Sequence, residues 1–272
     1  MKTARLSLHH LTAMEVGASE LVGLAARSGC QDVCLFTYMP AAFRHKYPLV
    51  ERADAKQLAA KMQRLSIGCL SLEVFPLTLD ADFAAMERSL EIGAMLGARY
   101  ATVHSHLEEH GQARDMLGRL AEIARIYSIR AAVEFNPFSK VTTLAQAAEL
   151  IGPLENSNVG LVLDTLHAAR AGTQPAAISA VQHRIDFVQI SDGPAAIDQT
   201  DRWKEAMSGR SVPGTGELPL MQMLAGFEAD LSVSIEVPRE GGEPSDTGLK
   251  VLEAVKGARK TLELAGFETS GE

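Results

Sequence analysis

Residues 159–165 read VGLVLDT, a short apolar run that ends on Asp164 and a threonine. Runs of the same kind recur along the whole chain, and their apolar and β-branched residues are typical of short strands. We predict strands at 5–10, 32–38, 67–75, 100–105, 129–136, 159–165, 185–192 and 232–237. This regular repetition of short strands is the feature that decides the fold.

Longer stretches between the strands carry one apolar stripe at helical spacing. We predict helices that include 18–28, 51–65, 81–96, 112–127 and 245–264. Eight strand–helix units in 272 residues average 272/8 = 34 residues each, the size of a βαβ element, in which a helix covers two parallel strands. The pattern predicts the α/β class and a single (β/α)8 TIM barrel domain over 1–272.

A doubly wound open sheet is the alternative fold. Its first strand-to-helix turn would be HHLTAMEVGAS (9–19), which lacks the glycine fingerprint of dinucleotide binding. The barrel is therefore the preferred prediction.

Composition restricts the partners of the protein. The net charge is −8, which disfavours a nucleic-acid partner, and no apolar run approaches the ~18 residues of a membrane span. We expect no membrane partner and no signal peptide.

The three cysteines, Cys30, Cys34 and Cys69, form neither a CxxC nor a zinc motif. Buried free thiols in a reducing cytoplasm are the expected state.

The longest irregular segment is 193–216, between the seventh predicted strand and its helix, and it contains the single tryptophan, Trp203. Strand-to-helix loops form the active-site face of a TIM barrel, and loops of this length are often functional. We predict a lid. The stretch PGTGE (213–217) is a weak glycine signal that predicts the turn ending this loop.

Four polar residues lie near the carboxyl ends of consecutive strands: Glu134, Asp164, Gln189 and Glu236. Their apolar neighbours should face the helices, which turns these four side chains into the barrel. For any one of them, a strand end in contact with water is the simpler explanation. Together, oxygen ligands that converge with few cations nearby in sequence favour a divalent metal, Mg²⁺ or Mn²⁺, with Zn²⁺ or Co²⁺ as alternatives.

Three further residues are candidates for substrate contact. His167 follows Asp164 by three positions, His104 has inward parity on its strand, and Arg210 lies in the long loop. Arginine suits clamping of a carboxylate, phosphate or hydroxyl. The simpler alternatives are a helix-start histidine, a barrel-interior histidine and a solvated loop arginine.

The pattern of these residues resembles that of the xylose isomerase-like TIM barrels. This family includes sugar-phosphate isomerases and epimerases, ketose 3-epimerases, inosose dehydratases, 3-dehydroshikimate dehydratases and endonuclease IV. The matching segments are VEFNP (133–137), LVLDTLH (161–167), FVQISD (187–192), RSVPGTGELP (210–219) and SIEV (234–237). They cover the second half of the barrel, and the first half matches only as generic βα units.

The resemblance implies that Glu134, Asp164, residue 189 and Glu236 bind the metal, with His167 and Arg210 on the substrate. Many members have His where this chain has Gln189. Gln there, with the Arg-x-x-Pro-Gly-x-Gly-Glu loop, looks most like the bacterial 3-dehydroshikimate dehydratases. The stretch after Glu134 lacks the histidine that some dehydratases use as base.

The primary hypothesis is a metal-dependent isomerase or epimerase of a small polyhydroxy carbonyl compound, with Glu134 and Glu236 transferring a proton on opposite faces of an enediolate. A lyase of the 3-dehydroshikimate dehydratase type is the alternative.

An endonuclease IV-like repair enzyme is disfavoured by the net charge and by Gln189. A barrel that binds without turnover is a fourth alternative. Related barrels commonly pair, so a homo-oligomer is a further expectation.

Overall fold

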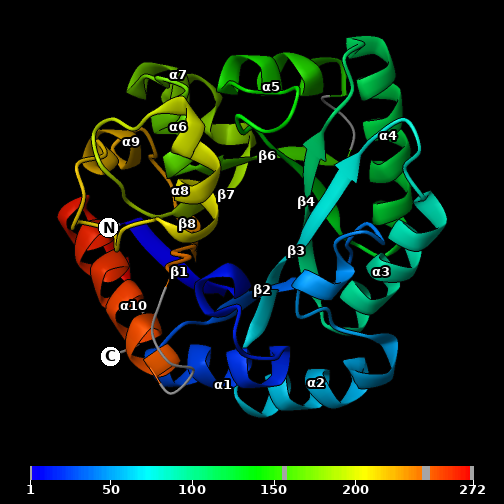
Figure 1. Cartoon of the computed structure of the whole chain (residues 1–272), viewed down its shortest axis with the longest axis horizontal. Helices are drawn as coiled ribbons and strands as arrows, with labels where there is room; N and C mark the ends of the chain where they lie inside the picture. Colours follow the sequence, from blue (N-terminus) through cyan, green and yellow to red (C-terminus); the bar gives the residue numbers. More distant parts are fainter. Residues whose placement is uncertain (1, 155–157, 241–245, 270–272) are drawn as a thin grey trace.

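The computed structural model describes residues 2–154, 158–240 and 246–269. Parallel strands surround a central axis and helices lie outside them (Figure 1). The barrel strands are β1 (Lys2–His9), β2 (Asp32–Phe36), β3 (Gly68–Leu77), β4 (Ala98–Ser105), β5 (Arg130–Glu134), β6 (Val159–Asp164), β7 (Ile185–Ile190) and β8 (Leu231–Ile235). Because β1 pairs with both β8 and β2, the sheet closes. The predicted (β/α)8 TIM barrel is confirmed.

Ten α-helices lie in the described part of the chain: α1 (Ala18–Ser28), α2 (Arg52–Arg64), α3 (Phe83–Met95), α4 (His110–Ile126), α5 (Leu144–Ile151), α6 (Thr165–Arg170), α7 (Pro175–Val181), α8 (Arg202–Ser208), α9 (Leu220–Leu224) and α10 (Thr247–Leu264). The five helices predicted by range correspond to α1–α4 and α10. Residue 245, at the start of the last predicted range, lies outside the described residues. In the part described, no helix has the length and hydrophobicity to cross a membrane.

Short 3₁₀ helices complete the connections: η1 (His10–Ala13), η2 (Arg44–Lys46), η3 (Gly152–Leu154), η4 (Gln182–Arg184) and η5 (Gln199–Asp201). A ninth strand, β9 (Phe267–Thr269), pairs in parallel with the first residues of β1. It lies beside the residues of β1 that precede the pairing with β2, so β9 extends the barrel wall at this edge.

Two sets of apolar side chains stabilise the barrel. A large outer core packs the strands against the helices, while a small inner core fills the barrel: Cys34, Leu70, Ala132, Val162 and Phe187. The inner residues of β5, β6 and β7 each precede by two positions a polar residue, namely Glu134, Asp164 and Gln189. Since alternate strand residues share a face, these polar side chains point inward, as their sequence parity predicts.

All three cysteines are free and buried, as predicted. Burial raises the pKa of Cys30 to about 12 and that of Cys34 to about 12. A thiol with so high a pKa is almost entirely protonated at neutral pH and is a poor nucleophile. The cysteines therefore belong to the packing of the barrel.

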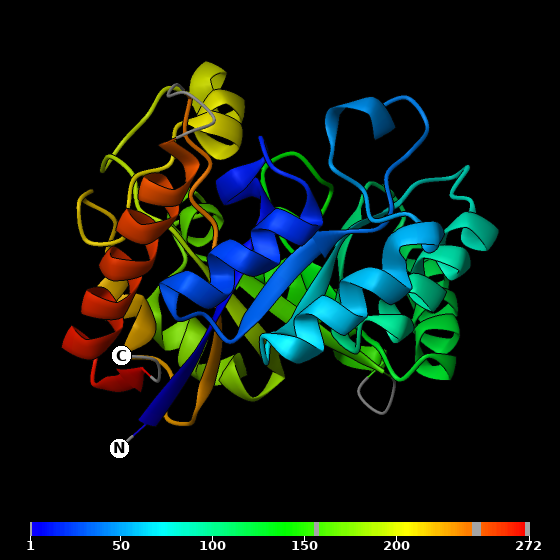
Figure 2. The same cartoon turned by 90° about the horizontal axis from the view of Figure 1, so that it is seen from below.

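The carboxyl ends of the strands open on the face that carries the longest connections. Seen from the side, α8 and the segment around η2 rise above this face, and both chain ends lie toward the opposite one (Figure 2). The 193–216 segment is not irregular throughout, since it contains η5 and α8. The prediction of an irregular loop is wrong to that extent.

The PGTGE stretch folds around one carboxylate. Asp192 accepts hydrogen bonds from the backbone N–H groups of Gly214, Gly216 and Leu218 at 2.9, 3.0 and 3.0 Å. Gly214 has φ +82°, and a Cβ on Gly216 would lie 2.5 Å from the Asp192 carboxylate, so both positions require glycine. The glycines thus make a tight turn that closes the loop at its base.

Candidate active site

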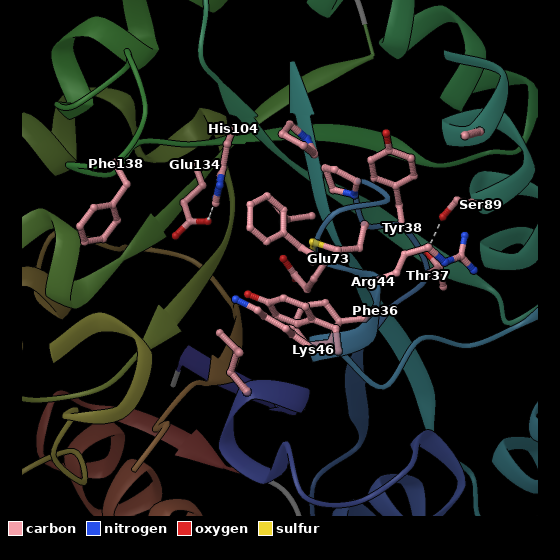
Figure 3. Close-up of a pocket in the computed structure, with 18 of the residues that line it drawn as sticks. Phe36, Thr37, Tyr38, Arg44, Lys46, Glu73, Ser89, His104, Glu134 and Phe138 are labelled. Carbon is pink, nitrogen blue, oxygen red and sulfur yellow. Dashed lines mark hydrogen bonds and ion pairs between the residues drawn. The ribbon is translucent and has the colours of Figure 1, made fainter. Parts of the chain in front are cut away.

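A cavity of about 1620 Å³ opens at the carboxyl end of the barrel. Six of the seven predicted site residues line it: His104, Glu134, His167, Gln189, Arg210 and Glu236. The seventh, Asp164, has no exposed surface and lies beneath them. Glu73 and the Glu134–His104 pair reach the cavity from different strands (Figure 3). The structure therefore brings the predicted residues together around one space.

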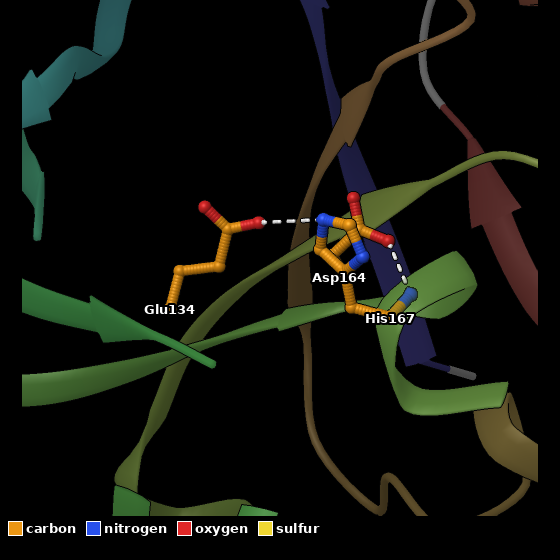
Figure 4. A group of neighbouring side chains, drawn as sticks. All are labelled: Glu134, Asp164 and His167. Carbon is orange, nitrogen blue, oxygen red and sulfur yellow. Dashed lines mark hydrogen bonds and ion pairs between the residues drawn. The ribbon is translucent and has the colours of Figure 1, made fainter. Parts of the chain in front are cut away.

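Glu134, Asp164 and His167 form a compact group (Figure 4). One donor atom from each lies within 4.8 Å of the others, and all three side chains are buried. His167 Nε2 is 3.7 Å from Glu134 Oε1, while Asp164 accepts a hydrogen bond from the His167 backbone N–H at 3.0 Å. Asp164 is thus also the N-cap of α6. His167, which the sequence analysis places against substrate, lies among potential metal ligands.

Arg210 reaches the same region from the loop after β7. Its Nη1 lies 2.5 Å from Asp164 Oδ2 and its Nη2 lies 2.9 Å from Glu236 Oε1. Its Nε donates to the Ala206 carbonyl at 3.0 Å. Burial opposes ionisation of Asp164, but Arg210 and His167 together outweigh it and lower the pKa of that carboxyl. Arg210 therefore offsets the negative charge of two carboxylates that lie far from it in sequence. In this conformation its side chain is buried.

His104 contacts Glu134 directly, with Nε2 at 2.5 Å from Oε2. Burial opposes a charge on this ring, but Glu134, with Glu73 and Glu236, outweighs it and raises the pKa of His104. By contrast, burial lowers the pKa of His167, which favours the neutral ring that a metal requires. The pKa values of these two histidines are therefore shifted in opposite directions, although both lie beside Glu134.

Two buried oxygen atoms at the site have no hydrogen-bond partner among the described residues: Gln189 Oε1 and Glu236 Oε2. Such atoms are costly unless an ion, water or ligand satisfies them. Burial raises the pKa of Glu236 to about 7, and the neighbouring Asp164 and Glu134 carboxylates add to the effect of burial. Carboxylate, imidazole and amide donors with unsatisfied oxygens fit a divalent cation.

Two buried residues of the cavity wall escaped the sequence analysis. Glu73 on β3 accepts a hydrogen bond from the Ser71 hydroxyl, and its Oε1 lies 3.5 Å from Nε2 of His9 on β1. Burial opposes ionisation of Glu73, but His9 and Ser71 together outweigh it and lower the pKa of Glu73. For Glu73 the signal was available, since it lies between the apolar Leu72 and Val74, as Glu134 lies between Val133 and Phe135. No recognisable motif surrounds either one.

Aromatic side chains form the wall beside His167. Phe138 packs edge-on against His167 with 6.1 Å between ring centroids, and Trp203 of α8 packs edge-on against Phe138 at 4.9 Å. Trp203 is 58% exposed and lines the cavity. The 193–216 segment thus contributes an apolar surface next to the polar group.

The sequence matches the model of the xylose isomerase-like TIM barrel family over residues 22–262. This match covers most of the chain and includes every residue of the site described above except His9. The chain therefore belongs to the xylose isomerase-like TIM barrel family.

Two curated relatives share about the same level of identity. A 3-dehydroshikimate dehydratase from Pseudomonas aeruginosa is 30% identical over 190 residues, which cover 65% of this chain and 29% of that protein. An inosose isomerase from Bacillus subtilis is 29% identical over 152 residues, which cover 54% of this chain and 52% of that protein. The matched region thus spans about half or less of each relative.

Among solved structures, a protein described as IOLI with a bound zinc atom superposes with a TM-score of 0.74 over 98% of both chains, at 22% identity. At this level of identity the likeness establishes the fold alone. It agrees with the closed parallel barrel seen here.

Proposed function

We propose that the protein is a divalent-metal-dependent isomerase or epimerase of a small polyhydroxy carbonyl compound. The observation that most supports this proposal is the buried group of Glu134, Asp164 and His167. Their donor atoms lie within 4.8 Å of one another at the base of the cavity. The name of the inosose isomerase relative supports this class of reaction.

Glu134, Asp164 and Glu236, with Gln189 as the amide ligand, are the proposed metal ligands, and His167 is added to them from the geometry. The unsatisfied Gln189 oxygen supports this set. Mg²⁺ or Mn²⁺ suits the oxygen-rich donors, and the imidazole also admits Zn²⁺ or Co²⁺. When bound, the ion polarises the substrate carbonyl and its neighbouring hydroxyl, which acidifies the C–H between them.

Glu134 and Glu236 are the proposed proton carriers. Both line the cavity while being 5% and 3% exposed, and they come from strands on either side of β6 and β7. Carboxylates are common general acids and bases in enzyme sites. One carboxylate removes the proton from the carbon next to the carbonyl, and the other protonates the opposite face of the enediolate. His104 holds Glu134 during this transfer.

The 3-dehydroshikimate dehydratase relative favours one alternative. From the same enediolate, loss of a β-hydroxyl as water, with a proton supplied to that hydroxyl, gives a conjugated product. The position after Glu134 that some dehydratases fill with a base is here occupied by Phe135 and Asn136. For this reason the isomerase or epimerase is the preferred proposal.

Incubation of the Mn²⁺-loaded protein with an inosose or with 3-dehydroshikimate in deuterated water separates the two reactions. Isomerisation or epimerisation incorporates deuterium next to the carbonyl, which NMR detects, without a new ultraviolet chromophore. Dehydration produces a conjugated or aromatic absorbance. If neither compound nor a panel of ketoses reacts, the proposed activity is wrong.

A nucleic-acid enzyme of the endonuclease IV type is less well supported. Its three-metal centre needs more ligand groups than one, and the part of the chain described here holds one group of three or more metal-binding side chains. The net charge of −8 also opposes binding to a polyphosphate backbone.

We also propose a cytoplasmic setting, with which the three buried free thiols accord.

A further inference from the structure

His9, at the carboxyl end of β1, stands between two carboxylates that come from opposite parts of the barrel. Its Nε2 is 3.5 Å from Glu73 Oε1 and 3.7 Å from Glu236 Oε2. All three side chains are at least nine-tenths buried, with exposures of 2%, 3% and 3%. The imidazole therefore connects the first half of the barrel to the proposed proton carrier on β8.

The backbone determines which ring nitrogen of His9 carries the proton. The N–H of Leu11 donates to Nδ1 at 3.1 Å, an arrangement that makes His9 the N-cap of η1. Because Nδ1 accepts this bond, it bears no proton, and the proton lies on Nε2. The Nε2–H is then directed toward the two carboxylates.

Two atoms without hydrogen-bond partners indicate which oxygen accepts the Nε2 proton of His9. Neither His9 Nε2 nor Glu236 Oε2 has a hydrogen-bond partner among the described residues. Their separation of 3.7 Å is longer than a hydrogen bond. A shift of the Glu236 carboxylate toward His9 would satisfy both atoms at once, whereas Glu73 Oε1, although nearer at 3.5 Å, already accepts from the Ser71 hydroxyl.

We propose that His9 is a positioning residue, which fixes the Glu236 carboxylate through a hydrogen bond from Nε2–H and leaves Oε1 oriented toward Arg210 and the metal group. The proposal rests on the proposed function in treating Glu236 as a site residue. Groups that orient metal-binding carboxylates and histidines typically affect metal affinity by about 10- to 100-fold.

Two substitutions separate this role from the capping role of the same ring. His9→Asn retains an acceptor near Nδ1 for the Leu11 N–H and removes the Nε2 donor. His9→Gln places an amide N–H near Nε2 and removes the acceptor. If His9 served only as a cap, His9→Gln would be the more damaging change.

Long-range ¹H–¹⁵N NMR of the histidine-labelled, metal-free protein tests the geometry, with His9→Asn assigning the resonance. We expect a proton on Nε2 and a shift of that nitrogen in Glu236→Gln. A proton on Nδ1 alone, or a resonance indifferent to Glu236→Gln, overturns the proposal without bearing on the activity.

Calorimetric titration with Mn²⁺ tests the consequence. We expect His9→Asn to bind Mn²⁺ about 10- to 100-fold more weakly with a melting temperature near that of the wild type, and His9→Gln to retain most of the affinity with a lower melting temperature. Wild-type affinity in His9→Asn, or equal losses in both variants, overturns the proposal. A wild-type protein that binds no Mn²⁺ contradicts the proposed metal, and the NMR result then still decides the role of His9.

Discussion

Arg210 and Asp164 form an ion pair in which neither side chain has appreciable exposure, with 2.5 Å between Nη1 and Oδ2. The second terminal nitrogen of Arg210 lies 2.9 Å from Glu236. One guanidinium thus compensates two carboxylates of the proposed metal site. Removal of a single partner from such a buried arrangement leaves charge without compensation in a region of low dielectric.

Arg210→Met should therefore destabilise the metal-free protein by about 3–5 kcal/mol. Urea unfolding followed by circular dichroism measures this loss. Arg44→Met is the matched control, because Arg44 pairs with Glu51 at the surface, where both side chains are more than half exposed; it should cost at most about 1 kcal/mol. Equal losses in the two variants would show that the buried pair has no special role.

The two-glutamate mechanism predicts that Glu134→Gln and Glu236→Gln each abolish detectable turnover, a decrease of at least about 10²- to 10⁴-fold, with the fold intact. Glutamine keeps the shape of the side chain and cannot carry the proton. Initial rates with whichever of inosose or 3-dehydroshikimate is converted provide the measurement. Glu149→Gln on the surface of α5 is the control and should retain full activity. Full activity in either site variant would exclude the mechanism.

Stability should also depend on pH through His10, which lies outside the proposed chemistry. Its Nε2 contacts the Val16 carbonyl at 2.9 Å, and its Nδ1 has no partner among the described residues. Burial lowers the pKa of His10 from 6.5 to about 4. The unfolded state therefore binds this proton more readily, so the contribution is fully present above pH 6.5 and is lost as the pH falls toward 4.

The corresponding loss between those pH values is about 3 kcal/mol in the free energy of unfolding. Chemical denaturation at a series of pH values measures it. His10→Gln keeps a donor for Val16 and cannot titrate, so its stability should change less over the same range. Parallel pH profiles for the two proteins would refute the assignment to His10.

If the 193–216 segment is a lid, ligand binding should alter the environment of Trp203, the single tryptophan of the chain. Trp203 lines the cavity and is 58% exposed, so closure over a ligand should reduce its contact with water and shift its emission to shorter wavelength. Fluorescence titration of the Mn²⁺-loaded protein with an inosose tests this. An unchanged spectrum at concentrations that saturate turnover would contradict the lid.

The strands and the direction of the site residues follow from local periodicity. Glu134 and Gln189 lie between apolar neighbours and Asp164 follows an apolar run, and a period of two fixes which face such a residue joins. The barrel then brings strand ends together without further information. For these residues, sequence alone predicts both the barrel and the inward direction of the side chains.

The pairing of Arg210 could not be predicted in the same way. It lies 46 positions from Asp164, and the path of a long loop depends on tertiary contacts such as those of Asp192 with the glycine turn. Glu73 carries the same inward signal as Glu134, but a polar strand residue without a motif, such as Glu73 or His9, has many simpler explanations. Their meaning depends on distances between separate strands.

The most direct test of the central claim is anomalous X-ray diffraction at the manganese edge from crystals of the protein soaked in Mn²⁺. We expect one strong peak at the cavity base, within reach of the proposed ligands Glu134, Asp164, Gln189 and Glu236 and of His167. A soaked crystal with no peak there, or with Mn²⁺ bound elsewhere, would contradict the metal-dependent function proposed for this barrel.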